Sequence, residues 1–204
     1  MTAIFVFSFV FPFLLLIALT QWVMKRLGKN VSGWISMLLI ALASGVLVVL
    51  PIGGLPGGRW LTTLFPNPSI PLTALLFSRT VKHSFQIKLL DSKALHTCRL
   101  LSLLAGVALY PMALGAGLFD PYSAGWHFSW LFVLLLVITL GLLFSKNRFS
   151  IVLLATILAY NLHLLESSNL WDYLIDPVLV LISVGAFISQ IAKHGFKALS
   201  AKQP

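Results

Sequence analysis

Seven long apolar runs fill most of this chain and limit what it can fold into. Each run is long enough, or nearly so, to cross the hydrocarbon core of a bilayer, which takes about 20 apolar residues. Only 9% of the 204 residues are charged, against roughly 25% in ordinary soluble domains, so polar groups are too few to cover a globule. The runs cover residues 3–24, 33–52, 60–78, 100–119, 128–145, 149–166 and 176–192. We therefore expect an all-α integral membrane protein.

The third run differs from the others because prolines interrupt it. Pro66, Pro68 and Pro71 remove backbone donors, and lipid offers the freed carbonyl groups no replacement partner. We expect a compact bundle of six full transmembrane helices plus one proline-broken crossing at 60–78. That makes about seven crossings within a single polytopic membrane domain over residues 1–204. A re-entrant segment that enters and leaves by one face is the alternative for 60–78.

The positions of the basic residues predict the orientation. Lysine and arginine lie in short clusters between the apolar runs, and such clusters mark the cytoplasmic side of a membrane protein. With the N-terminus outside and seven crossings, thirteen of the fourteen basic residues fall inside, and Arg59 falls outside. A re-entrant third run would move ten of them to the other side. The pattern predicts an external N-terminus and a cytoplasmic C-terminus. Small size and short loops favour a bacterial cytoplasmic (inner) membrane.

An amphipathic segment is predicted between the third and fourth runs. Residues 84–98 place Ile87, Ala94 and Cys98 on one helical face and Lys88 away from it. A helix of this kind lies on a membrane surface with its apolar face in the headgroup boundary. We expect it on the cytoplasmic side.

Helix starts are predicted at three places on the outer side. Asp120 and Asp176 each stand directly before a proline, the pattern of a capping carboxylate with proline at the first helical position. Asn169, followed three residues later by Asp172, resembles a loose capping box. It predicts a short interfacial helix over 170–175, with Trp171 and Tyr173 at headgroup level.

The most suggestive polar group lies near the end of the sixth run. His163 and Glu166 are three residues apart and would share a helical face. We expect Asp172 to approach them at headgroup level. Because histidine beside a carboxylate can supply a tuned acid or base, these three are candidate catalytic residues. The simpler interpretation is an interfacial histidine with a solvated carboxylate. Metal or haem ligation with His127 is a third, weaker one.

A second candidate group stands where the third run leaves the membrane. Arg79, Lys82 and His83 are spaced to lie on one helical face, and such clusters attract anionic lipid headgroups. They are candidate residues for binding an anionic headgroup. A generic positively charged anchor on the cytoplasmic side explains the same pattern.

The proline-broken run itself is a candidate transport path. Broken helices line substrate sites in many transporters because their free backbone groups can coordinate a ligand. The polar side chains here are Asn67, Ser69 and Thr73, without a carboxylate. A packed structural kink is the alternative interpretation.

No motif in the chain points to a particular reaction. Cys98 is the single cysteine, so neither an intramolecular disulfide nor a thiolate metal cluster is available. No metal-binding, nucleotide-binding or nucleophile motif accompanies the histidines and glycines. The net charge of +9 lies in loop clusters, which act as topology signals more often than as nucleic-acid contacts. We expect no metal, no cofactor and no nucleic-acid partner.

Function can therefore be predicted only as a class, and whether the chain is an enzyme stays open. The scarcity of charge within the runs favours a non-catalytic subunit or scaffold of an envelope-associated membrane complex. Its partners would be membrane lipids and either another protein or further copies of the chain. The alternative is an enzyme or binding protein that handles a lipid-linked or amphipathic substrate at the outer face through His163, Glu166 and Asp172. A second alternative is a small transporter that uses the segment 60–78.

Overall fold

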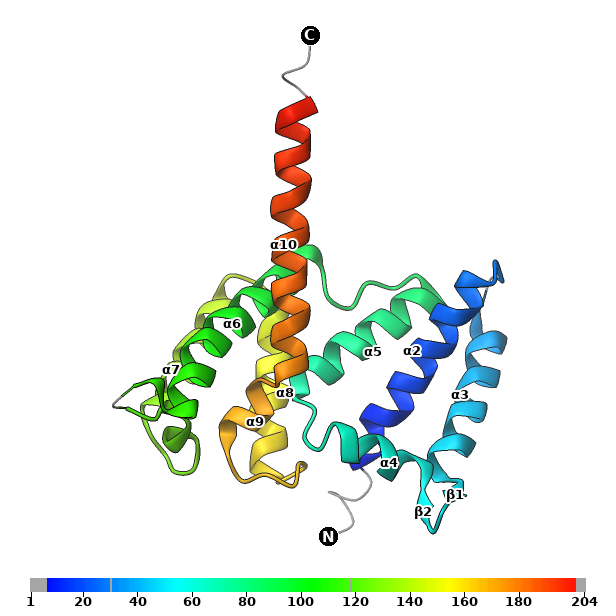
Figure 1. The fold of residues 1–204 in the computed structure, drawn as a ribbon, viewed down its shortest axis with the longest axis horizontal. Helices are drawn as coiled ribbons and strands as arrows, with labels where there is room; N and C mark the ends of the chain where they lie inside the picture. Colours follow the sequence, from blue (N-terminus) through cyan, green and yellow to red (C-terminus); the bar gives the residue numbers. More distant parts are fainter. Residues whose placement is uncertain (1–6, 30, 118, 201–204) are drawn as a thin grey trace.

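The computed structural model describes residues 7–29, 31–117 and 119–200, and within these ranges the fold is all-α, as predicted (Figure 1). Nine α-helices are found there: α2 (Val10–Arg26), α3 (Trp34–Val49), α4 (Gly57–Leu64), α5 (Ile70–Phe85), α6 (Ser92–Pro111), α7 (Trp130–Phe144), α8 (Phe149–Asn161), α9 (Leu170–Leu174) and α10 (Pro177–Ser200). A π-helical turn, η1 (Met112–Ala116), continues α6, and a 3₁₀ turn, η2 (Pro121–Gly125), precedes α7. The strands β1 (Pro51–Ile52) and β2 (Leu55–Pro56) form a small antiparallel hairpin.

The long helices run back and forth between two ends of the molecule (Figure 1). At one end the connections α2–α3, α5–α6 and α7–α8 meet: Gly33 N–H donates to Ser84 O, and Arg148 Nη1 donates to Lys88 O, each at 2.9 Å. We call it the basic end, because it includes Lys25, Arg26, Lys29, Lys82, Lys88, Lys93, Lys146 and Arg148. The other end holds the hairpin, α4, η2 and α9. We call it the acidic end, because it includes Asp120, Glu166 and Asp172 beside Arg59.

The helices form two groups that meet at the centre. Helices α2 to α5 lie on one side of Figure 1 and α6 to α10 on the other, with α5 packed on α8 between them. The molecule exposes 12668 Å² of surface, whereas a compact globule of this mass exposes about 9,400 Å². The chain therefore exposes more surface than a compact globule of the same mass.

Helix lengths also differ from the prediction. Among the described residues one helical stretch, Ser92–Ala116 (α6 with η1), is long and apolar enough to cross a membrane. Three of the shorter apolar helices, α3, α7 and α8, have 16, 15 and 13 residues, because caps and turns use the ends of those apolar runs. In the sixth run, for example, α8 ends at Asn161 and His163 adopts a left-handed conformation (φ 49°). Six full-length spans are thus not found within the described ranges.

The proline-broken run forms two helices joined by a strap. Helix α4 ends at Leu64 and α5 begins at Ile70, so Pro66 and Pro68 lie in the irregular segment Phe65–Ser69, which we call the FPNPS strap. Pro71 does not break a helix, because it lies in the first turn of α5, where no N–H donor is needed. The break is therefore confined to five residues.

The prediction of one continuous helix over 84–98 is wrong. Helix α5 ends at Phe85, Gln86 adopts a left-handed conformation (φ 59°), and the Asp91 carboxylate caps α6 by accepting from Ala94 N–H at 2.8 Å. Residues 86–91 are thus a connector between two caps. Ala94 and Cys98 are fully buried, so they do not form an exposed apolar face.

The short helix expected over 170–175 is found as α9. The Asn169 side chain caps it by accepting from Trp171 N–H at 2.9 Å. However, Trp171 and Tyr173 are buried and do not project as membrane anchors. Trp171 Nε1–H donates to Pro121 O at 2.9 Å, and Tyr173 OH accepts from Leu165 N–H at 3.1 Å. Both rings therefore fasten α9 to neighbouring loops.

Candidate functional site

A cavity of about 500 Å³ opens at the acidic end between α4, the start of α2 and the segment after α8; we call it the Arg59 cavity. Apolar side chains form most of its wall: Phe7, Phe11, Leu55, Pro66, Pro68, Leu164 and Leu165. Its polar side chains are Ser8, Arg59, Thr62, Thr63, Asn67 and Glu166. An apolar wall with a few polar groups, in a volume of roughly 300–1,000 Å³, is typical of small-molecule sites.

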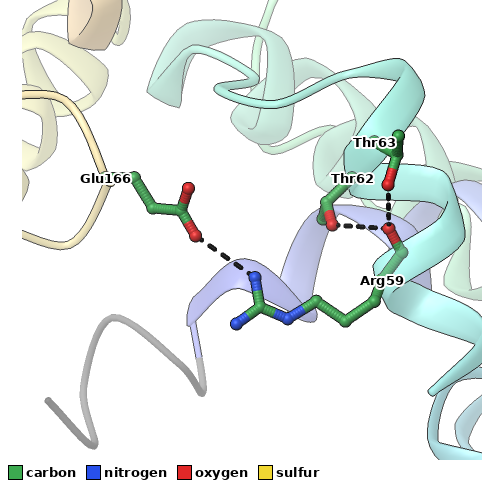
Figure 2. A network of polar contacts seen from close by, with 4 residues as sticks. All are labelled: Arg59, Thr62, Thr63 and Glu166. Carbon is green, nitrogen blue, oxygen red and sulfur yellow. Dashed lines mark hydrogen bonds and ion pairs between the residues drawn. The ribbon is translucent and has the colours of Figure 1, made fainter. Parts of the chain in front are cut away.

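An ion pair joins two walls of the Arg59 cavity. Figure 2 shows Arg59 of α4 and Glu166 reaching toward one another, with Nη1 and Oε1 3.2 Å apart. The hydroxyls of Thr62 and Thr63 both donate to the Arg59 carbonyl at 2.9 Å. Glu166 uses one carboxylate oxygen, and the side chains are 35% and 58% exposed. Such a pair contributes about 0–1 kcal/mol to stability, so a ligand can open it at little cost.

A second cavity of about 460 Å³ lies beyond the FPNPS strap; we call it the Asp172 cavity. Pro66, Asn67 and Pro68 line both cavities, so the strap is the wall between them. Asn67 Oδ1 is buried and has no hydrogen-bond partner among the described residues. A buried acceptor without a donor is costly, so a donor from a ligand would be favourable at this point in the wall.

The N-termini of α5 and α10 meet at Asp176, which lines the Asp172 cavity. Its carboxylate accepts from Ser69 N–H at 3.1 Å, from the Ser69 hydroxyl, and from Leu179 N–H at 2.9 Å. Two positive helix ends and three donors offset the desolvation of this buried charge. The predicted cap by Asp176 is confirmed, and the carboxylate also ties α10 to the strap. The other predicted cap, Asp120, starts the turn η2, while Ser129 caps α7.

The structure gives the three predicted catalytic residues separate partners. His163 is exposed beyond the end of α8 and its ring lies near that of Tyr160, tilted by 56° with ring centroids 6.3 Å apart. Since the helix ends at Asn161, His163 and Glu166 do not share a helical face. Glu166 pairs with Arg59, and Asp172 accepts from Tyr122 OH at 3.0 and 3.1 Å. No hydrogen bond or ion pair links the three side chains in the described part of the chain.

Asp172 belongs to a latch between α9 and η2. Its partner Tyr122 also accepts, through its carbonyl, from Asn169 Nδ2 at 3.0 Å. A side chain at Gly125 would collide with Asn169, so glycine is required where the two segments meet. Burial raises the pKa of Tyr122 to about 12, and the negative charge of Asp172 adds to the rise. Asp172 is therefore held by a protonated phenol, as a structural group.

The basic candidate residues lie on α5 at the basic end. Arg79 and Lys82 are exposed, and His83 is partly buried with an Nδ1 that has no partner among the described residues. Two further cations nearby are engaged: Lys93 Nζ donates to Ser145 O at 3.0 Å, and Arg148 donates to Lys88 O and Leu89 O. Binding of an anionic headgroup at Arg79, Lys82 and His83 stays a prediction.

The polar residues of the predicted transport segment have structural partners, with one exception. Ser69 caps α5 and holds Asp176, and the Thr73 hydroxyl donates to Ser69 O at 3.0 Å. Asn67 alone of the three lines both cavities through a side chain whose oxygen has no partner. The transport interpretation stays a prediction.

Sequence reasoning missed the role of Arg59. In the sequence, Arg59 is the single basic residue on the predicted outer side, where it stands among carboxylates. Its partner Glu166 is 107 positions away, so no local pattern joins them. The signal that could have found the site is Arg59 itself, because a cation that departs from the orientation rule needs a reason to be there.

Comparisons of the chain with protein families, curated proteins and solved structures find no match. Among the described residues, no group of three or more histidine, cysteine or acidic side chains is placed to hold a metal ion.

Proposed function

We propose that this protein is a multi-pass protein of a cytoplasmic membrane and that its Arg59 cavity binds an amphipathic, lipid-like molecule at the outer face. The binding proposal rests on one observation: an apolar cavity of about 500 Å³ with an ion pair at its mouth. A lipid-like molecule has the same division, with an apolar chain and a charged headgroup.

The exposed apolar surface supports the membrane location. Large aliphatic side chains are exposed on several helices, for example Leu39 at 62% on α3, Val137 at 61% on α7 and Leu181 at 69% on α10. Exposing this apolar surface to water costs roughly 25 cal/mol of free energy for each Å², whereas exposing it to lipid does not.

Tryptophan and charge support the same location. Trp22 and Trp34 are exposed near the basic end, and Trp60, Trp126 and Trp130 near the acidic end. Two aromatic levels at opposite ends are typical of the two interfaces of a membrane. The basic end carries the lysine and arginine clusters, so it would face the cytoplasm and the Arg59 cavity would face outward.

A blocked cavity tests the binding role. Thr63→Trp places an indole in the cavity, and Leu38→Trp adds the same ring on the exposed face of α3 as a matched control. Native mass spectrometry in mild detergent should detect a retained or added single-chain phospholipid on the wild type and on Leu38→Trp, but not on Thr63→Trp. Equal binding by all three proteins would contradict the role of the cavity.

A second role, as a subunit or scaffold of an envelope complex, is favoured by the shape of α10. Phe187 of α10 meets His96 of α6 edge to face, with ring centroids 5.8 Å apart. Helix α6 begins four residues before His96, while α10 continues thirteen residues beyond Phe187. At about 1.5 Å per residue, α10 projects about 14 Å past the start of α6. Figure 1 shows α10 extending beyond the other helices.

The exposed face of α10 next to its projecting end gives this second role a test. Ile188 and Ile191, level with the first turn of α6, are 61% and 72% exposed, and a partner helix would cover them. The double variant Ile188→Ala/Ile191→Ala should release the partner and shrink the complex in mild detergent. Leu181→Ala/Ile182→Ala, on the same helix beside α6, is the control and should not. A wild-type protein that is monomeric when extracted would contradict the subunit role.

A further inference from the structure

We infer that the headgroup taken by the Arg59 cavity is zwitterionic, with an anionic phosphate at Arg59 and a cationic amine at Glu166. This inference rests on the proposed binding of an amphipathic molecule. It goes further by naming the chemical class of the ligand.

The charges at the mouth of the cavity carry the argument. Among the described residues that line it, Arg59 and Glu166 carry the formal charges, and these have opposite signs. Their pairing is a single contact between Nη1 and Oε1 at 3.2 Å, not the two parallel contacts of a strong arginine–carboxylate pair. A molecule with one anionic and one cationic group can replace this contact with two, one between its anion and Arg59 and one between its cation and Glu166.

Headgroups of other charge types fit less well. A purely anionic headgroup would gain Arg59 but would stand next to the Glu166 carboxylate, and like charges at short range repel. A purely cationic headgroup would gain Glu166 but would stand next to the Arg59 guanidinium, which carries the same sign of charge. A neutral headgroup would leave both charges to be desolvated without a new partner, which is unfavourable.

Asn67 adds a third polar contact deeper in the cavity. Its buried Oδ1 has no donor among the described residues and belongs to the strap that lines the cavity. A hydroxyl on the linker between headgroup and chain, such as the free hydroxyl of a single-chain glycerophospholipid, would donate to it. The apolar side chains Phe7, Phe11 and Leu165 would then face the chain.

The test compares two probes with the same acyl chain: lysophosphatidylethanolamine, which is zwitterionic, and lysophosphatidylglycerol, which is anionic. Each is titrated into the purified full-length protein and bound fractions are read by native mass spectrometry. The wild type should prefer the zwitterionic probe by about five- to tenfold. Glu166→Gln should remove or reverse this preference, and Arg59→Gln should weaken binding of both probes. Leu38→Trp should behave as the wild type.

Three outcomes separate the inference from the function on which it rests. If the wild type binds neither probe, the proposed binding role fails. If it binds both equally, or prefers the anionic probe, the cavity binds amphipathic molecules but the zwitterionic inference is overturned. If Glu166→Gln keeps the wild-type preference and the thermal stability of the wild type, Glu166 does not contact the amine, and the inference is again overturned.

Discussion

Asp176 illustrates at the residue scale how this chain accommodates a buried charge. Three donors from the starts of α5 and α10 surround its carboxylate, so one side chain caps a helix and fastens it to the FPNPS strap. The cap was predictable, because an aspartate before a proline is a local signal. The contact with Ser69 was not, because it joins residues 107 positions apart.

Replacing Asp176 should destabilise the protein strongly. Asp176→Ala removes an acceptor from three buried or partly buried donors, and we expect a loss of about 2–4 kcal/mol in the free energy of unfolding. Asp120→Ala is the matched control, since Asp120 caps an exposed turn through one bond to Tyr122 N–H, and it should cost about 1 kcal/mol or less. Thermal unfolding in detergent measures both. Equal losses would contradict the role assigned to Asp176.

The Tyr122 phenol should stay protonated to unusually high pH. Its pKa is raised to about 12 from an ordinary value near 10. The raised pKa means that the bond to Asp172 contributes fully to stability below pH 10 and is lost as the pH rises through about 12. The difference between the ultraviolet titrations of the wild type and Tyr122→Phe should therefore have its midpoint near pH 12. A midpoint near pH 10 would show that the latch does not form.

At the scale of elements, the packing of α6 on α10 depends on one glycine. A Cβ at Gly106 would approach Val180 Cγ2 to 2.7 Å and Cγ1 to 2.9 Å, so the two helices touch at this point. The glycine allows the close approach on which the position of α10, including its projecting end, depends.

Enlarging Gly106 should separate the two helices. We expect Gly106→Leu to lower the free energy of unfolding by about 1–3 kcal/mol, and Val180→Ala in the same chain should recover part of the loss. Gly141→Ala on α7, where an added Cβ meets nothing within 4 Å, is the control and should be neutral or stabilising. Thermal unfolding of the four proteins checks this. If Gly106→Leu leaves the free energy of unfolding unchanged, the contact between Gly106 and Val180 is contradicted.

Elements were predictable where their signals were local. The apolar runs located the long helices, and Asn169 located the start of α9. The expected helix over 84–98 was wrong because its apolar spacing continues through Gln86, whose left-handed conformation ends α5, and through the cap at Asp91. The spacing of apolar residues indicates which side chains could share a helical face. It does not indicate where the backbone leaves the helix.

The candidate site was less predictable than the fold for the same reason. Glu166 was identified from its neighbours, but the residue it contacts, Arg59, comes from another part of the chain. His163 was expected on a helix, yet the chain has already left α8 there. The cavity arises from the way α4, the strap and the segment after α8 come together, and none of these contacts is encoded by local spacing.

At the scale of the whole molecule, the two ends differ in charge and in architecture. The basic end consists of short connectors tied by backbone contacts such as that of Arg148 to Lys88 O. The acidic end holds the hairpin, the latch and the Arg59 cavity. The proposed function requires a membrane between these two ends, with the cavity on the outer side.

Thiol labelling in intact cells tests that central claim most directly. The native Cys98 is buried and serves as the unlabelled background. Single cysteines are introduced at Ser168, exposed at the acidic end, and at Lys88, exposed at the basic end, and a membrane-impermeant maleimide is applied. We predict that Ser168→Cys is labelled in intact cells and that Lys88→Cys is labelled only after the membrane is permeabilised. Labelling of Lys88→Cys in intact cells, or of neither variant before permeabilisation, would contradict the account.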